Sequence, residues 1–201
     1  MEKFIEHRGK TVALFQPNID TDQILPKQFL KRIEKTGFGD FLFYDWRFDE
    51  NGNQNKEFVL NQPQFKHASI LLAGKNFGSG SSREHAVWAL RDYGFRVVIA
   101  PSFGEIFYNN CFNVGLLPIN LPEKTVEELV RKNEEIQNYE LVVSLLTKKI
   151  SDDFGLSIDF EIEDFRREKL LNGWDDIDMI LRFEKEIRNY EKKRPAWMPK
   201  V

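Results

Sequence analysis

The residues best suited to chemistry lie in the stretch NFGSGSSREH, residues 76–85. It contains Gly78 and Gly80, and glycine permits positive φ and a close approach of the backbone to a ligand. Ser81 and Ser82 add hydroxyl groups, and Arg83 adds a planar fork of donors that matches a carboxylate. Because a helical pattern follows, unpaired amides of its first turn are expected beside these groups. Together they predict a cradle for an anion.

Other interpretations of this stretch are possible. A glycine-rich turn whose serines only cap the following helix stays open on the residues alone. The dinucleotide fingerprint fails because Arg83 occupies the third glycine position, and the phosphate-binding loop fails because Gly-Lys-Ser/Thr is missing. Ser81 and His85 are one helical turn apart, but no serine lies in a Gly-x-Ser-x-Gly elbow and no orienting acid is evident. His85 is more simply a helix residue bound to a nearby carbonyl.

A second polar group lies in NIDTDQILPKQFL, residues 18–30, where Asp20 and Asp22 bracket Thr21. Two carboxylates in an apolar neighbourhood could act on a proton or orient a partner residue. Asp-rich turns more commonly cap or turn the chain. By itself this segment is a weak signal.

The central elements must position these groups. Residues 67–74 and 95–101 are apolar runs of strand character, and between them residues 83–94 read as a helix that Gly94 ends. This order predicts a βαβ unit with parallel strands. The residues that follow predict a helix over 102–115, a strand over 116–121 and an amphipathic helix that begins at Thr125.

The flanking segments are less regular. Residues 4–15 predict one or two short strands around Gly9, and 33–61 predict a long, aromatic-anchored loop or a broken helix. Residues 139–150 and 156–165 predict two strands joined by a turn near Asp152. A helix stopped at Gly173, a charged surface helix running to about residue 195 and an extended tail over 195–201 complete the expected order.

Composition limits the possible classes of function. The 201 residues fit one domain, and 41% hydrophobic residues with 18 Phe predict a real core. The net charge of −3 argues against a nucleic-acid partner, and 30% charged residues argue against a membrane span. The single cysteine, Cys111, excludes a self-sufficient zinc or iron-sulfur site. The first ten residues lack the apolar core of a signal peptide, which predicts a cytoplasmic protein.

Five segments together resemble one family. Residues 18–30, 36–48, 76–95, 97–119 and 165–177 are similar, in order, to the small subunits of 3-isopropylmalate dehydratases, in the aconitase superfamily. The resemblance implies a single swivelling β/β/α domain over 1–201, of α/β class, with a partly open, barrel-like mixed sheet and flanking helices. It also implies a separate large subunit that carries a [4Fe-4S] cluster, so that this chain holds no cofactor itself.

The resemblance assigns roles to the polar segments. Ser81 takes the place of the catalytic serine, which as an alkoxide removes a proton from the carbon next to the departing hydroxyl. Arg83 takes the place of the arginine that grips a substrate carboxylate, and Ser82 with the amides around Gly80 would hold the anion. Asp22 matches the acid of a Thr-Asp-His-Ile segment. That segment here reads Thr-Asp-Gln-Ile, which puts any role of the missing imidazole in doubt.

The family's substrate-recognition loop falls on Phe29, Leu30, Lys31 and Arg32. Phe29 and Leu30 can supply the apolar pocket that an isopropyl group needs. Arg47 is a further candidate carboxylate ligand, and an equally good interpretation makes it structural, lying against neighbouring aromatic rings.

The resulting expectation is a hydro-lyase subunit that interconverts 2-isopropylmalate and 3-isopropylmalate in leucine biosynthesis. A serine alkoxide needs nearby positive charge and a site closed to water, so the chain alone should be inactive. A homoaconitate, citramalate or dimethylmalate dehydratase subunit is the near alternative, and a non-catalytic anion-binding module the distant one. The 33–61 loop is expected to order only in the complex.

Overall fold

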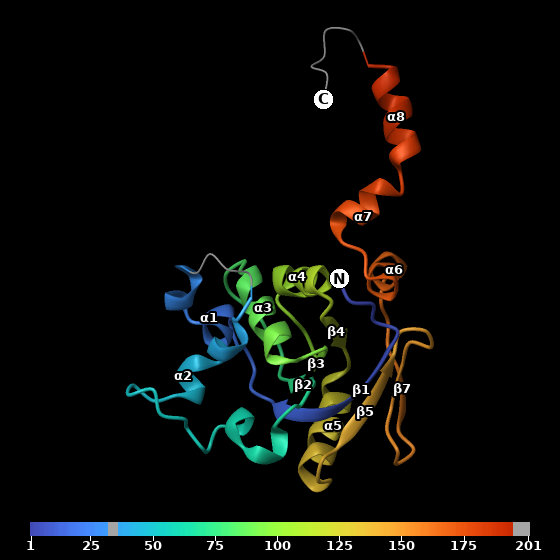
Figure 1. The fold of residues 1–201 in the computed structure, drawn as a ribbon. Coiled ribbons are helices and arrows are strands. Elements are labelled where there is room, and N and C mark those ends of the chain that lie inside the picture. The colour runs from blue at the N-terminus through green and yellow to red at the C-terminus, as the bar shows by residue number, and fades with distance from the viewer. Residues whose placement is uncertain (32–35, 195–201) are drawn as a thin grey trace.

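A seven-stranded mixed sheet forms the centre of the molecule (Figure 1). The computed structural model describes residues 1–31 and 36–194. The strand order is β4-β3-β2-β1-β5-β6-β7, in which β1 to β4 are parallel and β5 to β7 are antiparallel to their neighbours. The strands are β1 Glu6–Leu14, β2 Ile70–Ala73, β3 Val97–Ala100, β4 Leu117–Asn120, β5 Glu140–Ser144, β6 Lys149–Ser151 and β7 Ser157–Asp159. The predicted mixed sheet with flanking helices is confirmed.

Helices connect and cover the strands. Their bounds are α1 Thr21–Ile24, α2 Tyr44–Arg47, α3 Glu84–Tyr93, α4 Glu105–Val114, α5 Glu123–Glu135, α6 Asp164–Asn172, α7 Asp176–Leu181 and α8 Glu184–Lys192. Short 3₁₀ turns cover Lys27–Lys31, Gly39–Phe41, Val59–Asn61 and Pro63–Phe65. Within the part of the chain that the structure describes, no helix is long and apolar enough to cross a membrane.

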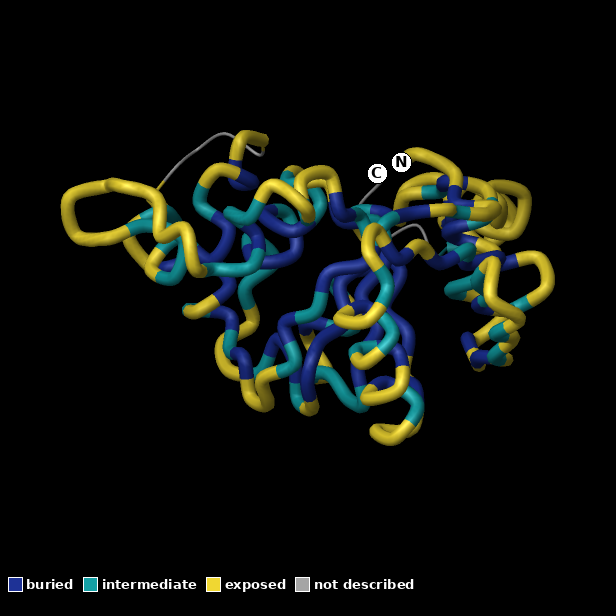
Figure 2. The backbone as a smooth tube through the Cα atoms, turned by 90° about the horizontal axis from the view of Figure 1, so that it is seen from below, coloured by how far each residue is buried: buried dark blue, intermediate teal, exposed yellow. Residues whose placement is uncertain are grey.

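Alternation along the central strands divides the core into two layers. Leu71 and Val98 point to the face that α3 covers, where they pack with Val87 and Leu90. The residues beside them in sequence face the opposite layer, which packs against α5 and β5. All four residues of β2 and of β3 are buried, as expected for parallel strands covered on both faces (Figure 2). The βαβ order read from the sequence is therefore confirmed.

Glycines end three helices as the sequence predicts. Gly94, Gly115 and Gly173 follow α3, α4 and α6 in the left-handed conformation. Their amides bond back to carbonyls of the last helical turn, which satisfies groups that would otherwise be unpaired.

Of the one or two strands predicted at the N-terminus, the structure has one, and it runs without a turn through Gly9, whose backbone pairs with Leu141 of β5. Two other predicted boundaries are wrong. The segment 139–150 is two strands, because the chain turns between β5 and β6 with Lys148 at positive φ. Helix α5 begins two residues before Thr125, whose amide already bonds to the Pro122 carbonyl.

The C-terminal segment also differs from the prediction. The expected single helix is two helices, α7 and α8, with a break at Arg182 and Phe183. Both lie outside the body, beyond α6 (Figure 1). Their surface position agrees with the prediction, and the tail over 195–201 lies outside the described residues.

The aromatic-rich segment packs onto the layer beside α3. Phe38 and Phe43 are fully buried, and the Phe43 ring stacks on Trp46 at 5.5 Å between centroids. The Tyr93 hydroxyl at the end of α3 donates to the Leu60 carbonyl at 3.1 Å. Residues 36–61 thus form short helical turns anchored by aromatic rings. Ordering of this segment only in the complex stays a prediction.

Candidate active site

The two polar segments meet at one edge of the sheet. Strands β1 and β2 are parallel neighbours, so the loops after them leave from the same edge, where ligands of α/β proteins commonly bind. The Thr21 amide donates to the Ser79 carbonyl at 2.9 Å, and the Gly78 amide donates to the Ile19 carbonyl at 2.7 Å. Residues 18–22 and 78–83 therefore form one bonded unit.

A capping box fixes helix α1 and explains Gln23. The Asp20 carboxylate accepts from the Gln23 amide at 2.8 Å, and the Gln23 side-chain oxygen accepts from the Asp20 amide at 2.8 Å. Asp20 is therefore the N-cap, and Gln23 is its partner in the capping box. This arrangement leaves Asp22, in the first turn, free to face the neighbouring loop.

Asp22 and Arg83 form an ion pair between the two loops. An Arg83 guanidinium nitrogen, Nη1, donates to the Asp22 carboxylate, and the Arg83 side chain is only 16% exposed. The second nitrogen, Nη2, lies 3.4 Å from Ser81 Oγ. Lys27 adds a second cation, with Nζ 3.7 Å from Asp22. The carboxylate thus holds the guanidinium beside the serine hydroxyl, where its charge favours an alkoxide.

The serines do not cap the following helix. Helix α3 has Arg83 as its N-cap, in an extended conformation and without a side-chain cap bond. Ser81 and Ser82 are both exposed. The buried Thr21 hydroxyl donates to the Ser81 carbonyl at 3.1 Å and so fixes the backbone of this residue. Ser81 is therefore exposed to solvent, while the hydrogen bond from the buried Thr21 side chain holds its backbone.

Two glycines in residues 78–83 adopt positive φ. Gly80 has φ of +91°, and a Cβ there would lie 3.5 Å from the Asp20 side chain. Gly78 has φ of +72°, and a Cβ there would lie 2.2 Å from the Phe107 ring of α4. At position 78, only glycine fits without movement of that ring. The loop accordingly rests on the first turns of α4.

The predicted substrate-recognition residues lie next to this unit in sequence, in the 3₁₀ turn after α1. Phe29 and Leu30 are half-buried against the core, and Phe29 stacks on Phe41 at 4.2 Å between centroids. Lys31 is exposed. Arg32 lies outside the described residues. The apolar character expected of this loop is present in Phe29 and Leu30.

Arg47 is occupied inside the aromatic segment. Its guanidinium donates to the carbonyls of residues 39, 40 and 42 at 3.3–3.4 Å and to the Asn61 side chain at 3.2 Å. It also lies 5.0 Å from the centre of the Tyr93 ring. Burial lowers the pKa of Arg47. These contacts favour the structural interpretation of this residue.

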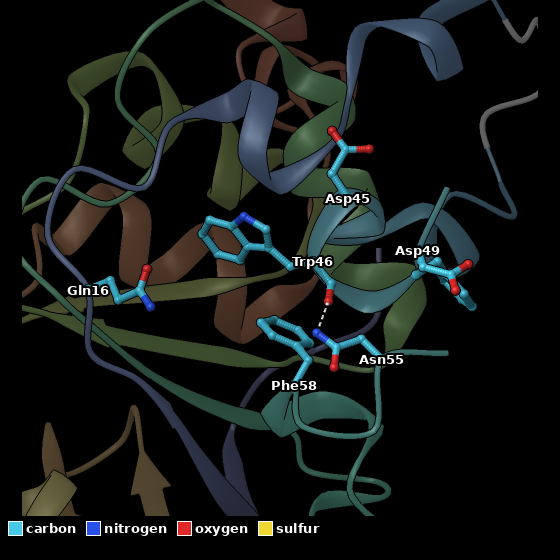
Figure 3. A pocket seen from close by; sticks show the side chains of 7 residues that line it. Gln16, Asp45, Trp46, Asp49, Asn55 and Phe58 are labelled. Carbon is cyan, nitrogen blue, oxygen red and sulfur yellow. Dashed lines mark hydrogen bonds between the residues drawn. The ribbon is translucent and has the colours of Figure 1, made fainter. Parts of the chain in front are cut away.

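A hollow is lined mainly by the aromatic segment (Figure 3), and Ser81 is not among its lining residues. Its volume is about 420 Å³, and Trp46 and Phe58 form its apolar wall. The Asn55 amide donates to the Trp46 carbonyl at 3.1 Å across its rim. None of the predicted site residues lines it, so the exposed serine loop, and not this hollow, carries the candidate chemistry.

His85 and Cys111 both pack against other parts of the chain. The His85 ring packs against Trp88 and Phe38, at 4.6 and 5.4 Å between centroids. Cys111 is fully buried, and burial raises the pKa of its thiol well above the usual value. Across residues 1–31 and 36–194, no group of three or more His, Cys, Asp or Glu side chains is arranged to hold a metal ion.

Sequence reasoning missed Thr21 and Lys27 as parts of the site. Thr21 carries a detectable signal, because its hydroxyl stands between the two acids of this segment. Lys27 carries no signal that distinguishes it from an ordinary surface residue.

The chain matches known proteins over nearly its full length. Residues 1–124 match the family described as aconitase C-terminal domain. The chain is 56% identical over 193 residues to the 3-isopropylmalate dehydratase small subunit of Geobacillus kaustophilus, covering 96% of this chain and 98% of the relative. It is 52% identical over 198 residues to that of Bacillus subtilis, covering 98% and 99%.

A solved structure agrees. The crystal structure of 3-isopropylmalate dehydratase from Methanocaldococcus jannaschii superimposes with a TM-score of 0.64 at 26% identity, covering 93% of this chain and 99% of the other. The resemblance read from the five sequence segments is thereby confirmed. The chain belongs to the family of 3-isopropylmalate dehydratase small subunits.

Proposed function

We propose that this chain is the small subunit of a hydro-lyase that interconverts 2-isopropylmalate and 3-isopropylmalate by dehydration and rehydration, in leucine biosynthesis. The names of relatives at 52–56% identity over nearly the whole chain support this. The observation that carries the chemistry is an exposed serine hydroxyl 3.4 Å from a guanidinium that a carboxylate holds in place. Small subunits have a large partner, which in this proposal binds over that hydroxyl.

Ser81 is the proposed base. As an alkoxide it takes the proton from the carbon next to the hydroxyl-bearing carbon, becoming a neutral hydroxyl, and in rehydration it returns that proton. Arg83 lowers the free energy of forming the alkoxide and offers its remaining donors to a substrate carboxylate. Ser82 and the amides around Gly80 hold the negative charge that develops on the carboxylate. Asp22 keeps Arg83 in place.

The iron-sulfur group belongs to the large subunit in this proposal. Cys111 is the only cysteine of this chain and is buried, which fits a cluster bound elsewhere. When bound, a [4Fe-4S] cluster supplies Lewis-acid chemistry at the substrate hydroxyl. This chain supplies the proton acceptor and the anion-holding groups.

The exposure of Ser81 explains why a partner is required. In water, an ordinary serine hydroxyl stays protonated near neutral pH, and a single adjacent arginine is strongly screened. Covering the loop with another protein excludes water and strengthens the effect of Arg83. The isolated chain is therefore expected to be inactive.

Phe29 and Leu30 are proposed to contact the isopropyl group, and Lys31 and Arg32 to belong to the same substrate-recognition loop. The half-buried rings and aliphatic side chain supply apolar surface beside Asp22 in sequence. The proposal needs no substrate contact from Arg47, whose donors are already engaged. A citramalate, homoaconitate or dimethylmalate substrate would be read by the same loop.

The test is an anaerobic assay of this chain combined with its cognate large subunit. Activity with 2-isopropylmalate is expected to exceed that with citramalate, homoaconitate and dimethylmalate. Substitution of Phe29 by Ala should reduce activity with isopropylmalate more than with citramalate, because the smaller substrate uses less of the apolar pocket. Equal or higher activity of the unmodified complex with another malate would refute the assigned substrate.

A further inference from the structure

The C-terminal arm, defined here as residues 176–192 with α7 and α8, exposes an unusual amount of apolar surface. It extends away from the body beyond α6 (Figure 1). Six large apolar side chains on it are exposed, and Ile177 and Tyr190 are each 66% exposed. The full set is Ile177, Ile180, Leu181, Phe183, Ile187 and Tyr190. Contiguous apolar surface of this kind marks an interaction site.

Four of these side chains, Ile180, Phe183, Ile187 and Tyr190, are called the stripe here. Phe183, Ile187 and Tyr190 are separated by four and three residues, the spacing that places side chains on one face of α8 and its N-cap, and Ile180 precedes them at the end of α7. On α8 the opposite face is charged and contains Lys185 and Lys192. This spacing is typical of a helix that lies in an apolar groove of a partner.

The short length of α8 also indicates that it needs a partner. It has nine residues, none of which is buried within this chain. Isolated helices shorter than about 12–15 residues are marginal in water, so α8 lacks the tertiary packing that usually stabilises so short a helix. Burying the stripe against another surface would supply that packing.

The arm begins close to the candidate active site. The first turn of α4 touches the serine loop, since a Cβ on Gly104 would lie 2.5 Å from the Gly78 carbonyl. The other end of α4 is next to Met1, whose carbonyl also lies against Gly173, three residues before the arm. Helix α4 has ten residues and is therefore about 15 Å long. One partner can therefore cover the serine loop and reach the arm.

The size of the stripe favours that arrangement over self-association. From their exposed fractions, its four side chains expose on the order of 500 Å², which lies within the roughly 300–600 Å² of the largest apolar patch on a typical monomer and below the roughly 800 Å² per partner of a standard interface. The stripe alone is small for a stable dimer of this chain. The exposed Ser81 and Ser82, and Ile106, which is exposed on α4, add surface that the same partner can cover.

We infer that the arm is a docking element for the large subunit, in which the stripe binds an apolar groove while the body covers the catalytic centre. This inference rests on the proposed function, because it uses the same partner. The arm tethers the subunits and takes no part in the chemistry. The matched relatives from Geobacillus kaustophilus and Bacillus subtilis align over 96% and 98% of this chain, so a segment of the arm's length is shared with proteins that have the same kind of partner.

The competing occupant is a second copy of this chain. In an antiparallel pair, Asp176 and Asp178 of one arm would lie near Lys192 and Lys193 of the other, which is a favourable pattern of charge. This arrangement would compete with large-subunit binding, and the oligomeric state of the isolated chain distinguishes the two.

The experiment measures binding of the purified chain to its cognate large subunit, by calorimetry under anaerobic conditions. The double variant Ile187→Ser with Tyr190→Ser removes half of the stripe, and the matched control Lys185→Ser with Lys192→Ser changes the opposite face of the same helix. We expect the stripe variant to bind on the order of tenfold more weakly or worse, and the control to bind within about twofold of the unmodified chain. Thermal unfolding checks that the body of each variant is intact.

Two further readouts separate the possible failures. At saturating large subunit the stripe variant should recover the unmodified kcat, whereas Ser81→Ala should bind normally and be inactive. Unchanged affinity of the stripe variant would overturn the docking role while leaving the proposed function in place. A dimer of the isolated chain that the stripe variant dissociates would assign the arm to self-association and also overturn the inference. Activity of Ser81→Ala would overturn the proposed function alone.

Discussion

Replacing Asp152 by Asn is expected to destabilise the fold in a pH-dependent way. The Asp152 side chain is fully buried, and its carboxylate accepts hydrogen bonds from Lys132 Nζ at 2.8 Å and from the Tyr139 hydroxyl at 2.7 Å. It also accepts from the amides of Phe154 and Leu156, both at 2.8 Å. These bonds join α5 to the turn between β6 and β7. One carboxylate therefore holds two elements together.

The size of the effect follows from the pKa of Asp152. Burial raises this pKa, but the bonds from Lys132, Tyr139 and the two amides outweigh burial and lower it from 3.8 to about 2. A difference of this size corresponds to roughly 2 kcal/mol of stability in favour of the charged form. Because the folded pKa is the lower one, this stability is present above pH 4 and is lost as the pH falls through about 2.

The assay is urea unfolding at pH 7 and at points between pH 4 and pH 2.5. Asp152→Asn should lose about 2–3 kcal/mol at pH 7, because Lys132 is left without its counter-ion and asparagine offers a weaker acceptor. The variant should also lose less stability than the parent as the pH falls from 4 to 2.5, because it has no Asp152 carboxylate to protonate. Asp153→Asn is the matched control, since its carboxylate is exposed and pairs with Arg8 at the surface, and it should change stability little. A variant at Asp152 as stable as the parent at pH 7, or with the same acid slope, would refute this reasoning.

The remaining predictions concern the serine loop. Thr21→Val should lower kcat of the reconstituted enzyme by roughly 3–10-fold with little change in KM, because the Ser81 carbonyl loses one hydrogen bond, and Thr21→Ser should restore it; a change confined to KM would count against a positioning role. Gly78→Ala should destabilise the chain by about 2–4 kcal/mol in thermal unfolding, because its Cβ meets the Phe107 ring. Gly52→Ala, which has a similar φ but open space around it, should lose only about 1 kcal/mol, and equal losses would exclude the steric cause.

Much of the central fold could be predicted from the sequence because its signals are local. Buried runs at 70–73 and 97–100, with a helix between them ended by Gly94, specify a parallel unit without knowledge of other contacts. The turn between β5 and β6 gave no such signal. It contains no glycine, proline or asparagine, and Lys148 adopts positive φ because pairing of the two strands imposes it.

The candidate site was predicted in its residues but not in its contacts. Ser81 and Arg83 are three-dimensional neighbours, as their spacing suggests. The bond from Arg83 to Asp22 joins residues 61 positions apart and depends on β1 lying next to β2. The loss of histidine at Gln23 was read as a departure from the family pattern, whereas the structure shows that the amide side chain completes a capping box. Tertiary placement therefore decides roles that residue type leaves open.

The most direct test of the account is the activity of Ser81→Ala in a complex with the large subunit whose formation has been verified. The account predicts unchanged affinity between the subunits, since a small exposed hydroxyl is removed, together with loss of isomerisation in both directions. Substrate binding should persist, because Arg83 and Ser82 remain. An assembled complex that still interconverts the isopropylmalates at a rate near that of the parent would contradict the assignment of Ser81 as the base.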